Sequence, residues 1–81
     1  MMTRDEVIET LLKNGAKLDR ATIYADVYLE YQTSTANILE YGVIVKHPRT
    51  GNPVENPYLA IRDRAEKKLA RMRDLNTKGL W

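Results

Sequence analysis

The sequence contains no cysteine and a single histidine, His47. Without cysteine, the chain can form no disulfide bridge, no thiolate nucleophile and no cysteine-ligated zinc site. His47 stands between Lys46 and Pro48 in a segment rich in turn residues, where we expect a solvent-facing side chain. It has no second histidine to share a metal ion with, and no partner carboxylate is indicated to orient it as a general base.

Long apolar runs are also missing, and none approaches the about 20 residues that span a bilayer. The N-terminus passes from Met2 and Thr3 into the charged residues Arg4, Asp5 and Glu6, without the apolar core of a signal peptide. The lack of cysteine agrees with an intracellular protein. We therefore expect a soluble, cytoplasmic protein with no membrane partner.

The few glycines are widely spaced. Gly42, Gly51 and Gly79 stand too far apart to form a phosphate-binding loop. The paired carboxylates Asp5 and Glu6 fall at the start of an expected helix, where they complement the helix dipole. The sequence therefore predicts no enzyme, no catalytic residue, no metal site and no cofactor.

Charge is nearly balanced overall but unevenly distributed. Thirteen Lys and Arg face eleven Asp and Glu, for a net charge of +2. Residues 1–47 carry five basic and seven acidic side chains, net −2, whereas residues 62–78 carry seven basic and three acidic ones, net +4. The basic segment is interpreted either as a solvated helix surface with internal ion pairs or as a contact for DNA phosphates.

The first expected helix covers about residues 3–14. Thr3 and Glu6 form a capping-box pattern at its start, and Asn14-Gly15 suits its end. A second helix is expected over about residues 19–41, with Asp19 as N-cap and Gly42 as the stop. At 1.5 Å per residue this helix would be about 33 Å long, longer than a compact domain of this size is wide, at about 30 Å. We therefore expect an elongated molecule.

Residues 43–56 are expected to connect the two long helices. The β-branched run 43–45 could pair with residues 54–56 as a short hairpin, or the segment could be an ordered loop, since Pro53 lacks an amide donor. Asn56-Pro57 then marks the start of a third helix, over about residues 57–75, because Asn suits the N-cap and Pro the first helical position.

These elements predict an all-α fold in a single domain, residues 1–81: a short N-terminal helix and a long antiparallel helical hairpin. Each long helix offers one apolar stripe, which leaves the flanks needing cover from a bundle or from other copies of the chain. We expect a homo-oligomer, with a ring favoured. The interface is assigned to Tyr24, Tyr28, Tyr31, Ile38, Ile61, Leu69, Met72 and Trp81.

The first two expected helices have the outline of a helix-turn-helix motif. The second begins Asp19-Arg20-Ala21-Thr22 and then turns aromatic, so its first turn has few groups to read base edges. We do not expect base readout of this kind.

Residues 42–59 read Gly-Val-Ile-Val-Lys-His-Pro-Arg-Thr-Gly-Asn-Pro-Val-Glu-Asn-Pro-Tyr-Leu. This run resembles the core signature of phage terminase small subunits of the p-twenty-seven type. In that family a helix ends at Gly, a β-branched stretch and a polar turn follow, and Asn-Pro-Tyr-Leu opens another helix. The similarity extends over about residues 21–75.

The resemblance implies a phage- or prophage-encoded DNA-packaging subunit in the bacterial host cytoplasm. Such subunits form rings, bind viral double-stranded DNA and present it to the large subunit, which holds the ATPase and nuclease. Leu80-Trp81 could dock on the large subunit, but we expect it to pack on a neighbouring protomer. The alternative is a helical protein-interaction adaptor without DNA contact. DNA phosphates would be contacted by Arg62, Lys67, Lys68, Arg71 and Arg73.

Overall fold

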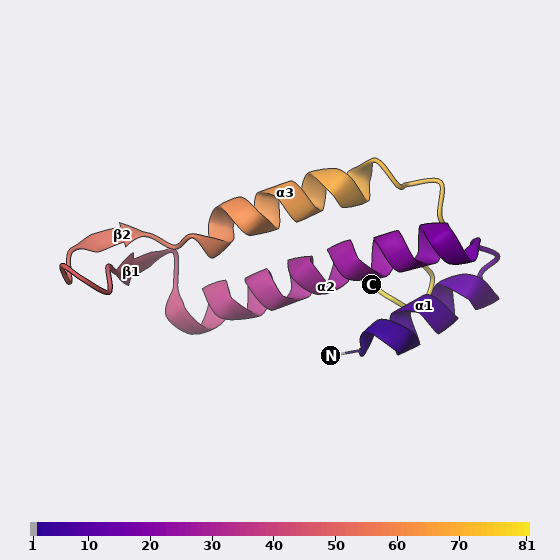
Figure 1. Ribbon diagram of the computed structural model, residues 1–81, viewed down its shortest axis with the longest axis horizontal. Coiled ribbons are helices and arrows are strands. Elements are labelled where there is room, and N and C mark those ends of the chain that lie inside the picture. The colour runs from indigo at the N-terminus through magenta and orange to yellow at the C-terminus, as the bar shows by residue number, and fades with distance from the viewer. Residues whose placement is uncertain (1) are drawn as a thin grey trace.

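The computed structural model describes residues 2–81 as three helices and a two-stranded sheet (Figure 1). In chain order the elements are α1 (Arg4–Lys13), α2 (Leu18–Tyr41), β1 (Ile44–Lys46), β2 (Pro53–Glu55) and α3 (Tyr58–Ala70). The molecule measures 49 × 22 × 18 Å along its principal axes, which confirms the expected elongated shape. The fold is thus mostly helical, with a small sheet added to the predicted helices.

The start of α1 follows the predicted capping box. The Thr3 hydroxyl accepts a hydrogen bond from the Glu6 amide at 3.2 Å, and the Thr3 amide donates to Glu6 Oε1 at 2.9 Å. The predicted N-cap of α2, Asp19, is wrong. The N-cap is Lys17, two residues earlier, which has an extended backbone and makes no side-chain capping hydrogen bond. The turn after α1 is short, with the Ala16 amide bonded to the Leu11 carbonyl, so the helix begins before Asp19.

The segment between α2 and α3 is a hairpin rather than a plain loop. β1 and β2 pair antiparallel, with Ile44 opposite Glu55, Val45 opposite Val54 and Lys46 opposite Pro53. Pro53 is tolerated because it is the first residue of its strand, where its missing donor costs little. The hairpin extends beyond the helices at one end of the molecule (Figure 1).

Helix α3 is shorter than predicted, ending at Ala70 instead of residue 75. Beyond it, the Met72 amide bonds to the Leu69 carbonyl and the Leu75 amide to the Met72 carbonyl, which are turns of the tighter 3₁₀ kind. These turns let Met72 and Leu75 pack against the core while the chain returns toward α1. The helical spacing of apolar residues thus continues past Ala70 to Met72 and Leu75, although the helix itself ends at Ala70.

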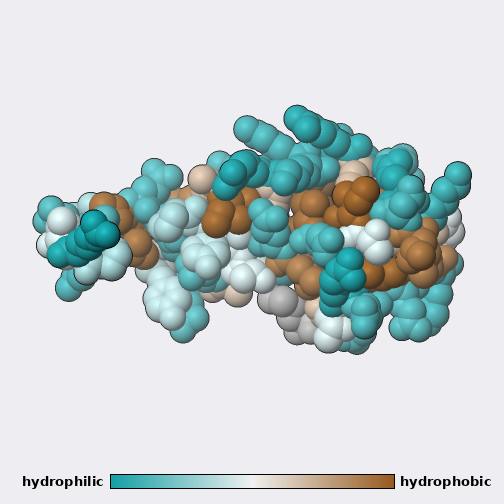
Figure 2. All heavy atoms as spheres, viewed as in Figure 1, coloured by the Kyte–Doolittle hydropathy of each residue, from teal (hydrophilic) through white to brown (hydrophobic). Residues whose placement is uncertain are grey.

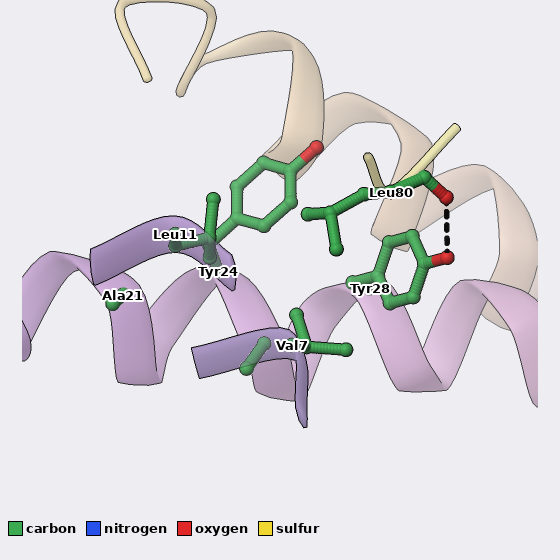
Figure 3. Close-up of a cluster of buried hydrophobic side chains, with 7 residues drawn as sticks. Val7, Leu11, Ala21, Tyr24, Tyr28 and Leu80 are labelled. Atoms are coloured by element: carbon green, nitrogen blue, oxygen red, sulfur yellow. Dashed lines mark hydrogen bonds between the residues drawn. The ribbon is translucent and has the colours of Figure 1, made fainter. Parts of the chain in front are cut away.

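The core lies where α1, the first half of α2 and the C-terminal segment 76–81 meet (Figure 3). The Tyr28 hydroxyl donates a hydrogen bond to the Leu80 carbonyl at 2.7 Å, and Asn14 Nδ2 donates to the carbonyls of Asn76 and Lys78. The C-terminal segment therefore covers the core, and we call residues 76–81 the strap. The buried cluster consists of Val7, Leu11, Ala21, Tyr24, Ala25, Tyr28 and Leu80.

Candidate functional site

Helix α3 carries an exposed row of positive charge. Residues 64, 67, 68 and 71 follow the i, i+3, i+4, i+7 spacing that places side chains on one face of a helix. Arg71 belongs to the row because, as C-cap, it keeps a right-handed helical backbone. Glu66 is rotated away from this row, whereas Asp63 stands four residues before Lys67, at the edge of the row. We call Arg64, Lys67, Lys68 and Arg71, all exposed, the basic stripe.

The basic stripe is not neutralised within the chain. The ion pairs found among residues 2–81 join Arg4 to Asp26 at 2.7 Å and Arg20 to Asp74 at 2.9 Å, and neither involves a stripe residue. The four cations are therefore free to meet an external anion.

Three of the five residues predicted to contact DNA, namely Lys67, Lys68 and Arg71, lie in the stripe. Arg62 is half-buried, and at about 100° per residue it points about 140° away from Lys67 around α3. Arg73 is exposed but lies in the turns after α3. Sequence reasoning missed Arg64, although its spacing to Lys67, Lys68 and Arg71 was the signal that could have found it.

Among the tyrosines predicted for an interface between chains, Tyr24 and Tyr28 are largely covered by their own chain and Tyr31 is half-buried. Tyr24 and Tyr28 are 3% and 4% exposed. Trp81 Nε1 donates a hydrogen bond to the Tyr24 hydroxyl at 2.9 Å, and the Trp81 ring meets Tyr28 and Tyr31 edge-on at 4.9 and 5.5 Å between centroids. Burial raises the pKa of Tyr24, and the bond from Trp81 partly offsets that rise. Trp81 thus packs on its own chain in this structure, although 60% of it remains exposed.

The aliphatic residues of the predicted interface lie at the contact between the chain's own elements. Ile38 is buried, and Ile61, Leu69 and Met72 are half-buried. Leu69 and Met72 pack against the core cluster. That these residues also form contacts between chains stays a prediction.

A groove runs between α2 and α3, and Figure 2 shows hydrophobic atoms gathered along the middle of this face. Its volume is about 460 Å³. A second hollow of about 280 Å³ adjoins it toward the hairpin, with Tyr58 lining both. Glu30 and Arg64 are the charged residues of the larger hollow, which we call the α2–α3 groove. It is lined by Leu29, Glu30, Thr33, Ser34, Tyr58, Ile61 and Arg64.

His47 has a local structural role. Its Nδ1 accepts a hydrogen bond from the Arg49 amide at 3.1 Å, and its own amide donates to the Asn52 carbonyl, so it shapes the hairpin turn.

Residues 2–81 contain no group of three or more metal-ligating side chains that could hold an ion. Within the same residues, none of the helices has the length and apolar character needed to cross a membrane.

A helical hairpin with an exposed basic stripe beside an apolar groove is typical of a small module for nucleic-acid binding or assembly. The family model described as "Phage terminase, small subunit" matches residues 4–75, which include all three helices and the hairpin. The chain belongs to this family, as the resemblance of residues 42–59 predicted. Neither the curated proteins nor the solved structures include a significant match.

Membership of the family supports a role in phage DNA packaging. Small subunits of phage terminases are generally non-catalytic adaptors, and the family implies association with the terminase large subunit and with phage DNA. The matched range ends before residues 76–81, which form the strap over the core.

Proposed function

We propose that this protein is the DNA-engaging small subunit of a phage or prophage terminase in the bacterial host cytoplasm. Several copies assemble into a ring, bind viral double-stranded DNA through the basic stripe and present it to the large ATPase and nuclease subunit. The observation that carries the DNA half of this proposal is the stripe itself, four exposed cations on one helix face with no ion-pair partner among residues 2–81.

The charge of one stripe is modest, and assembly increases its effect. Each phosphate neutralised by Lys or Arg releases condensed counterions, and the logarithm of the binding constant falls by about 0.9 per phosphate for each tenfold rise in salt. A ring repeats the stripe once per copy, so weak contacts add along the DNA. Contacts of this kind set position and orientation on the duplex but carry no sequence information.

Fluorescence anisotropy with a labelled duplex at several salt concentrations tests the DNA contact. The double variant Lys67→Gln, Lys68→Gln is expected to bind more weakly and to lower the salt slope by about 1.8 per chain in contact, from about 0.9 for each phosphate lost. The matched control Lys13→Gln, Arg49→Gln removes the same charge from exposed sites outside the stripe and should leave the slope nearly unchanged.

Two results would count against the DNA contact: no binding by the assembled wild-type protein at low salt, or equal losses in the two double variants. Assembly without any DNA binding would favour the alternative function, a helical protein-interaction adaptor.

A further inference from the structure

The backbone hydrogen bonds of the hairpin determine which groups each strand directs outward. The Asn56 amide donates to the Val43 carbonyl, and the His47 amide donates to the Asn52 carbonyl. In an antiparallel pair, bonded and non-bonded positions alternate along each strand. The odd-numbered residues of β1 therefore bond to β2, and the even-numbered residues direct their N–H and C=O groups away from it.

The two edges of this sheet are not equivalent. β1 directs the backbone groups of Ile44 and Lys46 outward, two donors and two acceptors, and the sheet that the structure describes has two strands only. On the β2 edge the corresponding residues are Pro53, which has no N–H, and Glu55. Proline interrupts an edge against further pairing. The β1 edge is therefore the one that can accept another strand, and we call it the open edge.

Apolar surface flanks the open edge. Val43 and Ile44 are 53% and 58% exposed. On the opposite face of β1, Val45 is the strand residue that lines the hollow of about 280 Å³, together with Tyr41 and Tyr58. The hairpin extends beyond the helices, so the edge can be reached from outside (Figure 1). A strand added there would place every second side chain on the side of this hollow.

Charge at the hairpin favours an acidic partner. Residues 43–54 contain Lys46 and Arg49, both exposed, and no acidic side chain. Glu55 lies on β2, away from the open edge. Glu40, in the last turn of α2, is exposed but is not part of the hollow's lining. The ion pairs among residues 2–81 use neither basic residue of the hairpin. A second copy of the edge would bring the same positive charge, so a partner of opposite charge fits better.

We propose that the open edge binds an extended segment of a partner protein, with alternating acidic and apolar residues, as a third strand. Its backbone pairs with the outward groups of Ile44 and Lys46, a carboxylate lies beside Lys46, and an apolar side chain opposite Val45 covers the hollow. Backbone pairing of this kind supplies affinity, and the alternating side chains supply specificity. The contact goes beyond the proposed function, because it uses neither DNA nor the basic stripe.

A synthetic peptide of alternating valine and glutamate is the probe. Hydrogen exchange measured by NMR is expected to slow at the amides of Ile44 and Lys46 when the peptide is added. The Val45 amide, which bonds within the hairpin, should be slow both with and without peptide. A peptide of the same sequence, methylated at every second backbone nitrogen so that one edge loses its donors, leaves the protein unchanged and should not bind when those nitrogens face β1. A peptide of alternating valine and lysine should bind more weakly.

Matched proline variants identify the edge. Ile44→Pro removes an outward donor without touching the bonds between β1 and β2, and Glu55→Pro makes the same change directly opposite, on the β2 edge. Ile44→Pro is expected to weaken peptide binding by about tenfold, from roughly one lost hydrogen bond and the bulk of the ring. Glu55→Pro should leave the affinity unchanged. Lys46→Glu should reverse the preference, so that the valine–lysine peptide binds better. Circular dichroism verifies that each variant is folded.

The inference is overturned if the valine–glutamate peptide leaves the exchange of Ile44 and Lys46 unchanged, if the methylated peptide binds equally well, or if Glu55→Pro weakens binding as much as Ile44→Pro. Displacement of the peptide by duplex DNA would also overturn it, because the hairpin would then be a nucleic-acid contact. The anisotropy measurement with Lys67→Gln, Lys68→Gln tests DNA binding separately, so failure of the peptide contact leaves the proposed packaging role standing.

Discussion

At the scale of single residues, the side chain of Tyr24 combines two roles. It fills the core beside α1, and its hydroxyl accepts a hydrogen bond from Trp81 Nε1. Burial disfavours the phenolate, so the pKa of Tyr24 lies above its ordinary value of 10.0. The folded chain therefore keeps this proton to a higher pH than the unfolded chain does.

This shift predicts a loss of stability in alkali. The contribution of Tyr24 is fully present below pH 10, the ordinary pKa, and is lost as the pH rises toward the raised pKa of the folded state. Tyr24→Phe should flatten the fall in the urea midpoint measured between about pH 9 and pH 11. Tyr41→Phe, at a side chain 61% exposed, serves as control and should change the profile little. The prediction is contradicted if the urea midpoint falls equally steeply with rising pH in the wild type and in Tyr24→Phe.

At the scale of elements, Asn56 joins the end of α2 to the start of α3. Its Oδ1 accepts from the Tyr58 amide at 3.0 Å, although α3 begins at Tyr58 with Pro57 at the N-cap position, one residue later than predicted. Its Nδ2 donates to the Gly42 carbonyl at 2.8 Å and to Asn37 Oδ1 at 3.0 Å. Asn56 is 2% exposed, and its partners Asn37 and Gly42 are half-buried.

We expect Asn56→Ala to lower the free energy of unfolding by about 2 kcal/mol or more, since each buried polar group left without a partner costs about 1–3 kcal/mol. Asn56→Asp separates the two roles, because it keeps the acceptor for Tyr58 but loses the donor to Gly42. Asn56→Asp should lower the free energy of unfolding at least as much as Asn56→Ala, since its carboxylate would face two oxygen acceptors, Asn37 Oδ1 and the Gly42 carbonyl. Urea denaturation measures both variants, and Asn52→Ala, at an exposed turn position, is the control. Near-neutral behaviour of Asn56→Asp would show that only the cap matters.

At the scale of the whole molecule, the strap at residues 76–81 ties distant parts of the chain together. Leu80 is 7% exposed and lies against α1 and α2 (Figure 3). Bonds from Asn14 and Tyr28 hold its backbone. Because the strap closes over the core, its apolar side chain should matter to the stability of the whole fold.

Leu80→Ala is therefore expected to lower the free energy of unfolding by about 2–5 kcal/mol, the usual range for removing a buried leucine side chain. Leu18→Ala removes the same atoms from a side chain 61% exposed and should cost less than about 0.5 kcal/mol. Thermal or urea unfolding of the two variants gives the comparison. Equal losses would mean that the strap is not part of the cooperative core.

Much of the fold was predictable because the signals are local. The Thr3 and Glu6 capping box, the turn at Gly42 and the Asn56-Pro57 pair each act over a few residues, and helix spacing is visible without tertiary contacts. The basic stripe belongs to this category as well, since Arg64, Lys67, Lys68 and Arg71 share a face in any helix. Most of the candidate DNA-contacting site could therefore be predicted, and Arg64 could have been included.

Local patterns in the sequence were enough to predict three helices, the family and the placement of basic residues on the last helix. Tertiary contacts were needed to show that Trp81 and Leu80 return to cover Tyr24 and Tyr28. They were also needed to show that α3 ends at Ala70 and that Leu39 stays exposed. The reason is physical: periodicity shows which side chains need burial, but which segment buries them depends on contacts between residues more than 50 positions apart, such as Tyr28 and Leu80.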